Sequence, residues 1–138
     1  SAVDEVRKDS NRQSEANDKQ IQKINYLEKI GIKVKAMYII GLPTDNKKTF
    51  AETLNYAKKI NSSYAQFSVF TPYPGTPVFS EYKDKINVKS YEEFTQWQLV
   101  FDHLNFSKDE IDDILSSAYQ KYYLNPKWLL KHFKSKFL

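Results

Sequence analysis

In the first part of the chain, segments with the hydrophobic spacing of a helix are followed by segments with the pattern of a strand. Residues 17–30 have the spacing of an amphipathic helix, with Asn17 placed to cap its start and Gly31 placed where helices often end in the left-handed region. The apolar stripe of this helix consists of Ile21, Ile24, Leu27 and Ile30. Residues 32–40 alternate at first and are then continuously apolar, which predicts a strand that ends buried on both faces.

A second helix and a second strand come next. Thr44 or Asp45 can cap a helix that ends at residues 61–63. The inward face of this helix consists of Phe50, Leu54, Ala57 and Ile60. Residues 64–70 are the next predicted strand. Strand, helix and strand in this order predict parallel strands joined by a right-handed crossover, and the helix at 17–30 predicts a further strand upstream.

The strand-and-helix alternation ends near Pro77, and helices are predicted for most of the remaining chain. A short helix is expected over residues 78–85, and another is expected to begin at Ser90. The apolar residues of the helix at Ser90 are Phe94, Trp97, Val100 and Phe101. This half of the chain is therefore predicted to be an α-helical region.

A longer helix begins with the capping box of Ser107 and Glu110. Its apolar positions have helical spacing: Ile111, Ile114, Leu115, Ala118 and Tyr122. The pair Asn125-Pro126 ends it, because proline cannot continue a helix at that point. Residues 127–138 form a basic and aromatic terminal helix.

Composition limits the chemistry of the chain itself. Its 138 residues include no cysteine, which excludes disulfides, zinc–thiolate sites and cysteine-ligated iron–sulfur clusters held by this chain. Three glycines are few for a complete α/β enzyme, and a two-strand parallel unit cannot cover both of its faces. The chain is therefore expected to be part of a larger domain, and a cytoplasmic setting is the default expectation.

Two loops at the ends of the predicted strands carry the main chemical signal. Residues 41–45 read Gly-Leu-Pro-Thr-Asp, and residues 71–77 read Thr-Pro-Tyr-Pro-Gly-Thr-Pro. The carboxyl ends of parallel strands share one edge of a sheet, where α/β folds place their sites. Taken separately, the first loop is more often a plain strand-to-helix turn and the second a rigid exit loop. His103 and His132 lack the spacing of metal ligands.

Taken together across one helix, the two loops resemble the C-terminal part of the radical S-adenosylmethionine barrel, in particular the group that often carries an N-terminal cobalamin-binding domain. The matching segments are Gly31–Val34, Tyr38–Pro43, Phe50, Leu54 and Phe70–Pro77. The resemblance covers residues 1–80, from the fourth helix to the sixth strand, and residues 81–138 are similar to the helical extension of that group. The implied fold class is α/β, the C-terminal part of a (β/α)6 partial TIM-type barrel followed by an α-helical extension.

In that family a 4Fe–4S cluster on the three cysteines of a CxxxCxxC loop reductively cleaves S-adenosylmethionine to a 5′-deoxyadenosyl radical. Because this chain has no cysteine, the resemblance implies a fragment that is inactive alone and needs the missing N-terminal part of the barrel as its partner. Cobalamin is a further cofactor that the resemblance allows. A small-molecule or lipid-like substrate is expected, and nucleic acid is not. Exposed strand edges would favour a homodimer of the fragment.

The resemblance also assigns site residues. Ile39, Ile40 and Gly41 would lie on the adenine side of the cofactor, where glycine allows close approach of the backbone. Arg12 matches a basic residue suited to bidentate binding of the methionyl carboxylate. The exit of the sixth strand, near adenine or substrate, would be lined by Thr71, Pro72 and Tyr73.

A non-enzymatic interpretation stands beside the enzymatic one. The chain carries a net charge of +4, and its terminal helix is basic and amphipathic. Such a module could bind a protein, RNA or an anionic membrane surface through this helix. Docking of the terminal helix on another domain is favoured over membrane binding, because Trp128, Leu129 and Leu130 could fill a seam of the missing domain.

Overall fold

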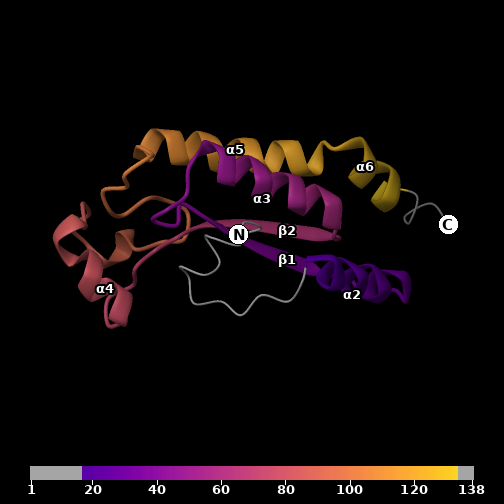
Figure 1. Ribbon diagram of the computed structural model, residues 1–138, viewed down its shortest axis with the longest axis horizontal. Coiled ribbons are helices and arrows are strands. Elements are labelled where there is room, and N and C mark those ends of the chain that lie inside the picture. Colours follow the sequence, from indigo (N-terminus) through magenta and orange to yellow (C-terminus); the bar gives the residue numbers. More distant parts are fainter. Residues whose placement is uncertain (1–16, 134–138) are drawn as a thin grey trace.

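The structure is a computed structural model that describes residues 17–133 (Figure 1). Its regular elements, in chain order, are α2 (Asn17–Lys29), β1 (Lys35–Ile40), α3 (Lys47–Ile60), β2 (Tyr64–Val69), α4 (Pro77–Tyr82), α5 (Lys108–Tyr123) and α6 (Pro126–Phe133). Two short 3-10 helices lie between α4 and α5, at Lys83–Lys85 and Tyr91–Glu93. The class is α/β, as the sequence predicts. No helix in this described part is long and apolar enough to cross a membrane.

The two strands pair in parallel. Lys35 lies opposite Tyr64 and Ile40 lies opposite Val69, so the strands run in register over their full length. The helix α3 connects them, which confirms the predicted order of strand, helix and parallel strand.

One face of the sheet is covered by α3 and α5, which lie over it in Figure 1. Every second strand residue faces these helices, because side chains along a strand alternate between its faces. We call this the helical face, and it presents Tyr38, Ile40, Phe67 and Val69, all less than 9% exposed. Phe67 is fully buried, stacks on Tyr38 at 5.2 Å between ring centroids and meets the edge of Tyr119 at 5.4 Å.

The opposite face of the sheet, which we call the open face, is not covered by a helix of the described chain. Met37 is 60% exposed and Ile39 42% exposed there. The continuous apolar run of β1 predicted burial on both faces, and for the described residues this prediction is wrong. Only the alternate residues that face α3 and α5 are buried, so two large apolar side chains of β1 remain in contact with solvent.

Helix ends follow the local sequence closely. Gly31 has φ of 91°, its N–H donates to the carbonyl of Glu28, and Ile32 N–H donates to the carbonyl of Leu27, which together form a Schellman motif. This confirms the predicted end of the first helix, although Ile30 lies beyond it and is 54% exposed rather than part of the stripe. The cap of α3 is Asn46, not Thr44 or Asp45 as predicted, because its side chain accepts the first free backbone N–H groups of the helix.

The helix predicted to begin at Ser90 does not form beyond a single 3-10 turn. Leu99, Val100 and Phe101 are consecutive and all nearly fully buried, which one face of a helix cannot achieve. An irregular chain instead lies against the end of the sheet, with Phe101 bridged to Ile86 and the carbonyl of Gln96 accepting the N–H of Val69 at 2.7 Å.

The last helix docks on the same chain. Trp128 donates its indole N–H to the carbonyl of Ser62 at 3.1 Å, and the ammonium group of Lys131 donates to the carbonyl of Asn61 at 2.7 Å. These contacts place α6 beside the start of β2. The indole of Trp128 is therefore engaged within the chain rather than available to a membrane or a second protein.

Two tyrosines of the core provide a matched prediction. The hydroxyl of Tyr38 is buried without a hydrogen-bond partner, whereas that of Tyr122 donates to the carbonyl of Ser62 at 2.8 Å. Tyr38→Phe is expected to leave stability unchanged or raise it by up to about 1 kcal/mol, and Tyr122→Phe to lower it by about 1–2 kcal/mol. Urea unfolding of both variants measures the difference. Equal destabilisation by the two substitutions would contradict the assigned hydrogen bonding.

Candidate functional site

A cavity of about 510 Å³ lies at the carboxyl ends of the two strands, on the open face. It is lined by Met37, Tyr38, Ile39, Leu42, Ser68, Val69, Phe70, Thr71, Tyr73 and Gln96. Both strand-exit loops contribute to it, as the parallel pairing requires. The place that the sequence predicts for a site is thus a concave surface in the structure.

The loop after β1 is held rigidly. The carboxylate of Asp45 is buried and accepts the backbone N–H of Leu42 at 3.1 Å and the hydroxyl of Thr49 at 2.8 Å. His103 reaches the same loop from the second half of the chain. Its Nδ1 accepts the N–H of Asn105, so Nε2 carries the proton and donates to the carbonyl of Leu42 at 2.8 Å. Asp45 and His103 therefore position the loop, and neither lines the cavity.

The loop after β2 is also ordered by local bonds. Pro74 and Gly75 occupy the centre of a turn closed by a hydrogen bond from the N–H of Thr76 to the carbonyl of Tyr73, and Gly75 supplies the positive φ of 86°. The hydroxyl of Thr71 lies 3.0 Å from the carbonyl of Thr95. These contacts hold Thr71 and Tyr73 at the cavity wall.

A short chain of hydrogen-bonded polar side chains reaches the cavity lining. The amide of Gln66 donates to the hydroxyl of Ser68 at 3.2 Å, and that hydroxyl donates to Oε1 of Gln96 at 3.3 Å. Ser68 and Gln96 both line the cavity, between the exposed side chains of Met37 and Ile39 and the exit loop. This arrangement offers apolar contact area with an amide and a hydroxyl group beside it.

The residues assigned to the adenine side lie in different places. Ile39 is half-exposed and lines the cavity. Ile40 is 2% exposed on the helical face, so only its main chain could reach a ligand on the open face. Gly41 has φ of 71°, and a Cβ there would lie 3.4 Å from Ile111 and 3.6 Å from Val69. These are ordinary van der Waals distances, so the positive φ of the turn, and not the packing of α5, explains why glycine stands at this position.

Of the other assigned residues, some line the cavity and some do not. Thr71 and Tyr73 line the cavity, and Tyr73 is 44% exposed. Pro72 is fully buried and is not part of the lining. Arg12 lies outside the described residues.

The lining residues that were not assigned from the sequence include Met37, Ser68 and Gln96. Met37 and Ser68 could have been found, because the two-residue period of a strand places them on the same face as Ile39. Gln96 gives no such signal, since it belongs to an irregular segment that only the tertiary structure brings to the strand ends.

Among the described residues, the cavity lining contains no carboxylate, histidine or amine, and its two tyrosines differ in position. Burial raises the pKa of Tyr38, whose hydroxyl lies on the helical face, and the nearby Tyr122 and Tyr56 raise it further. Within residues 17–133 no group of three histidine, aspartate or glutamate side chains could hold a metal ion.

Comparison with known proteins decides the relationship. No protein-family model matches the chain. An uncharacterized methyltransferase of Pyrococcus horikoshii is 32% identical over 114 residues, which cover 80% of this chain and 25% of that protein. An anaerobic magnesium-protoporphyrin IX monomethyl ester cyclase of Rubrivivax gelatinosus is 27% identical over 106 residues, covering 77% of this chain and 19% of the cyclase.

A third relative has a different activity by its name. The tRNA-2-methylthio-N(6)-dimethylallyladenosine synthase of Buchnera aphidicola is 33% identical over 76 residues, 55% of this chain and 17% of the synthase. The chain is a homologue of radical S-adenosylmethionine enzymes. The resemblance drawn from the strand-exit loops is thereby confirmed, and these relatives are enzymes by their names. The chain spans a quarter or less of the length of these three relatives.

Proposed function

We propose that this radical S-adenosylmethionine homologue supplies the last part of a (β/α)6 partial barrel. In this proposal residues 1–80 run from the fourth helix to the sixth strand, with β1 and β2 as the fifth and sixth strands, and residues 81–138 form the helical extension. The order of elements, the parallel pairing and the position of α3 and α5 on one face all support it. The open face would then be the interior of the barrel.

The observation that carries the proposal is the cavity on the open face at the carboxyl ends of both strands. Met37 and Ile39 leave apolar surface exposed that a monomeric two-strand sheet has no means to cover. The preceding strands of the barrel would pair with the free edge of β1 and enclose this surface. A second copy of the chain could occupy the same edge, and light scattering distinguishes the two partners by mass.

The lining fits part of S-adenosylmethionine. A flat adenine would lie against the side chains of Met37 and Ile39, where the NH2 group of Gln96 could donate a hydrogen bond to it and the hydroxyl of Thr71 could accept one. When bound, S-adenosylmethionine supplies the adenosyl or methyl group of the reaction. The 4Fe–4S cluster does not fit this chain, because its 138 residues contain no cysteine to ligate it. Its ligands would come from the missing part of the barrel.

The substrate and any cobalamin belong to the whole protein. The names of the relatives point to molecules as different as magnesium-protoporphyrin and a tRNA adenosine. The apolar lining supports a small molecule. Cobalamin in the parent protein follows from the resemblance and is tested by the absorption spectrum of the purified whole protein.

Activity of the whole protein tests this proposal. The parent protein, reconstituted with iron and sulfide, is expected to cleave S-adenosylmethionine, whereas the 138-residue chain alone is not. In the parent, Ile39→Lys is expected to raise the KM for S-adenosylmethionine at least tenfold, about 1.4 kcal/mol of lost binding. Leu104→Lys makes the same change at a residue that is 86% exposed and outside the cavity lining. Equal KM values for the two variants would show that this cavity does not bind S-adenosylmethionine.

The non-enzymatic alternative makes a different prediction. An interaction module would bind RNA or anionic vesicles in a manner that weakens steeply with salt, and would show no protection of residues 39–41 by S-adenosylmethionine. The engagement of Trp128 within the chain and the enzymatic names of the relatives both favour the first proposal.

A further inference from the structure

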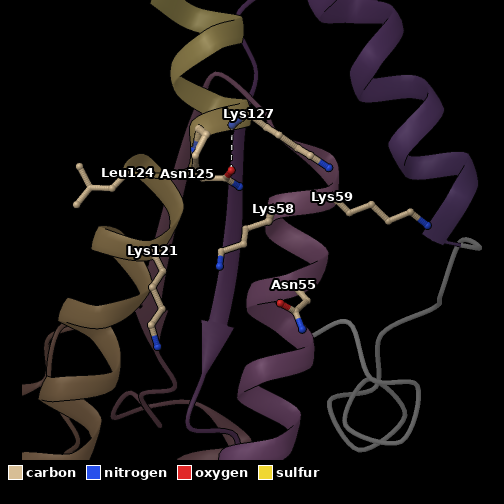
Figure 2. A pocket seen from close by; sticks show the side chains of 8 residues that line it. Asn55, Lys58, Lys59, Lys121, Leu124, Asn125 and Lys127 are labelled. Carbon is tan, nitrogen blue, oxygen red and sulfur yellow. Dashed lines mark hydrogen bonds between the residues drawn. The ribbon is translucent and has the colours of Figure 1, made fainter.

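A second cavity, of about 520 Å³, lies on the side of the molecule away from the open face. It forms a groove between α3 and α5 below the start of α6 (Figure 2). Its lining is Asn55, Lys58, Lys59, Lys121, Leu124, Asn125, Pro126 and Lys127. Four lysines and no carboxylate are among the described residues of this lining, so these residues carry charge of a single sign.

Three of the four lysines have no acidic partner among the described residues. Lys59 forms an ion pair with Asp18 at 3.3 Å and points away from the groove toward α2, as Figure 2 shows. The ammonium groups of Lys58, Lys121 and Lys127 make no ion pair within residues 17–133. In Figure 2, Lys58 and Lys121 extend into the groove from facing helices.

Two amides add hydrogen-bond donors to these charges. Oδ1 of Asn125 accepts the backbone N–H of Lys127 at 3.0 Å, which leaves its NH2 group for an acceptor in the groove. The side chain of Asn55 has no hydrogen bond within the described chain. The groove thus combines positive charge with neutral donors, and it presents no side chain that is acceptor-only.

Helix dipoles explain part of this pattern. Lys58 and Lys121 lie in the last turns of α3 and α5, where the partial negative charge of a helix end favours a cation. That charge is about half an elementary charge at each helix end, against the two full positive charges of Lys58 and Lys121, which extend into the groove. The dipoles therefore leave part of the positive charge uncompensated, and they do not account for the meeting of these two lysines at one concave surface.

We propose that this groove binds a compact, multiply charged phosphate anion. Lysine ammonium groups act as point charges toward phosphate oxygens, and a groove of one sign concentrates the field on its ligand. The lining residues within 17–133 include no aromatic side chain, so they offer no stacking platform of the kind with which proteins hold the bases of single strands. The oligophosphate itself, free or as part of a nucleotide, is what the groove recognises.

Titration calorimetry of the full chain with tripolyphosphate tests the proposal. Saturable binding is expected at low ionic strength, and Lys58→Gln combined with Lys121→Gln is expected to weaken it at least about tenfold. The matched control is Lys83→Gln combined with Lys89→Gln, which removes the same charge from exposed positions outside the groove lining. The control is expected to change affinity by less than about twofold.

Further measurements separate the sources of the phosphate and guard against general charge effects. ATP binding that matches tripolyphosphate assigns the site to the phosphate chain of either ligand, and tighter ATP binding assigns it to a nucleotide. Circular dichroism of both double variants establishes that they fold. Absence of saturable binding, an equal loss in the two double variants, or tight binding only to an RNA oligonucleotide would overturn the proposal. Because the groove and the open-face cavity share no lining residue, failure here leaves the proposed function untouched.

Discussion

Replacement of Phe67 by alanine is expected to lower the free energy of unfolding by about 4 kcal/mol, the usual range for a fully buried phenylalanine. Phe67 is 0% exposed at the centre of the helical face. Its ring contacts Tyr38, Tyr119 and Tyr122, with centroid distances of 5.2, 5.4 and 6.1 Å. Alanine would leave a cavity that three aromatic rings, each fixed by other contacts, cannot collapse to fill.

Urea unfolding followed by tyrosine and tryptophan fluorescence measures this loss. Tyr91→Ala is the control, since this ring is 80% exposed and its removal is expected to cost less than about 0.5 kcal/mol. A loss below about 1 kcal/mol for Phe67→Ala would mean that β2 does not form the centre of the core.

Replacement of Glu28 by alanine is expected to cost about 3 kcal/mol, because a buried carboxylate satisfies two backbone donors at once. Its side chain is 4% exposed. Oε1 accepts the N–H of Val34 at 3.1 Å and that of Ser63 at 2.7 Å, and Oε2 lies 3.3 Å from the ammonium of Lys131. One side chain of α2 thus ties together the approaches to both strands and the last helix.

The same carboxylate gives stability a defined dependence on pH. Desolvation of Glu28 favours its neutral form, but the backbone N–H groups of Ser63 and Val34 and the charge of Lys131 outweigh this and lower its pKa below the ordinary 4.5. A lowered pKa in the folded state stabilises the protein above pH 4.5, and this contribution is lost as the pH falls through the lowered value. Melting temperatures of the protein and of Glu28→Ala are therefore expected to converge in acid.

Glu52→Ala serves as the matched control, since Glu52 is exposed on α3. Its melting temperature is expected to follow that of the unmodified protein at every pH. Parallel melting curves for Glu28→Ala and the unmodified protein from neutral to acid pH would show that the carboxylate contributes no ionisation-linked stability.

Local sequence predicted the elements whose signals are local. The Schellman end at Gly31, the capping box at Ser107 and the apolar face of α3 all depend on residues within a few positions of one another. The prediction at Ser90 was wrong, because burial of three consecutive residues there is set by the end of the sheet and not by helical spacing.

The candidate site likewise has parts that local sequence predicts and parts that depend on the fold. Its two exit loops could be found from the sequence, since glycine and proline fix turns at the ends of apolar runs. Gly41 belongs to this local signal, because its positive φ of 71° is part of the turn that follows β1. Gln96 entered the cavity lining without any local signal, through a backbone hydrogen bond to Val69.

Patterns along the chain are enough to predict the order of helix, strand, helix and strand, the family resemblance and the absence of cluster ligands in this chain. Those properties depend on periodicity, turn residues and composition. Three further properties could be known from the folded chain alone: which face of β1 is covered, which of the assigned residues line the cavity, and which lysines meet in one groove. Each of these three properties depends on contacts between residues that are far apart in the chain. The packing of α3, α5 and α6 against the sheet determines those contacts.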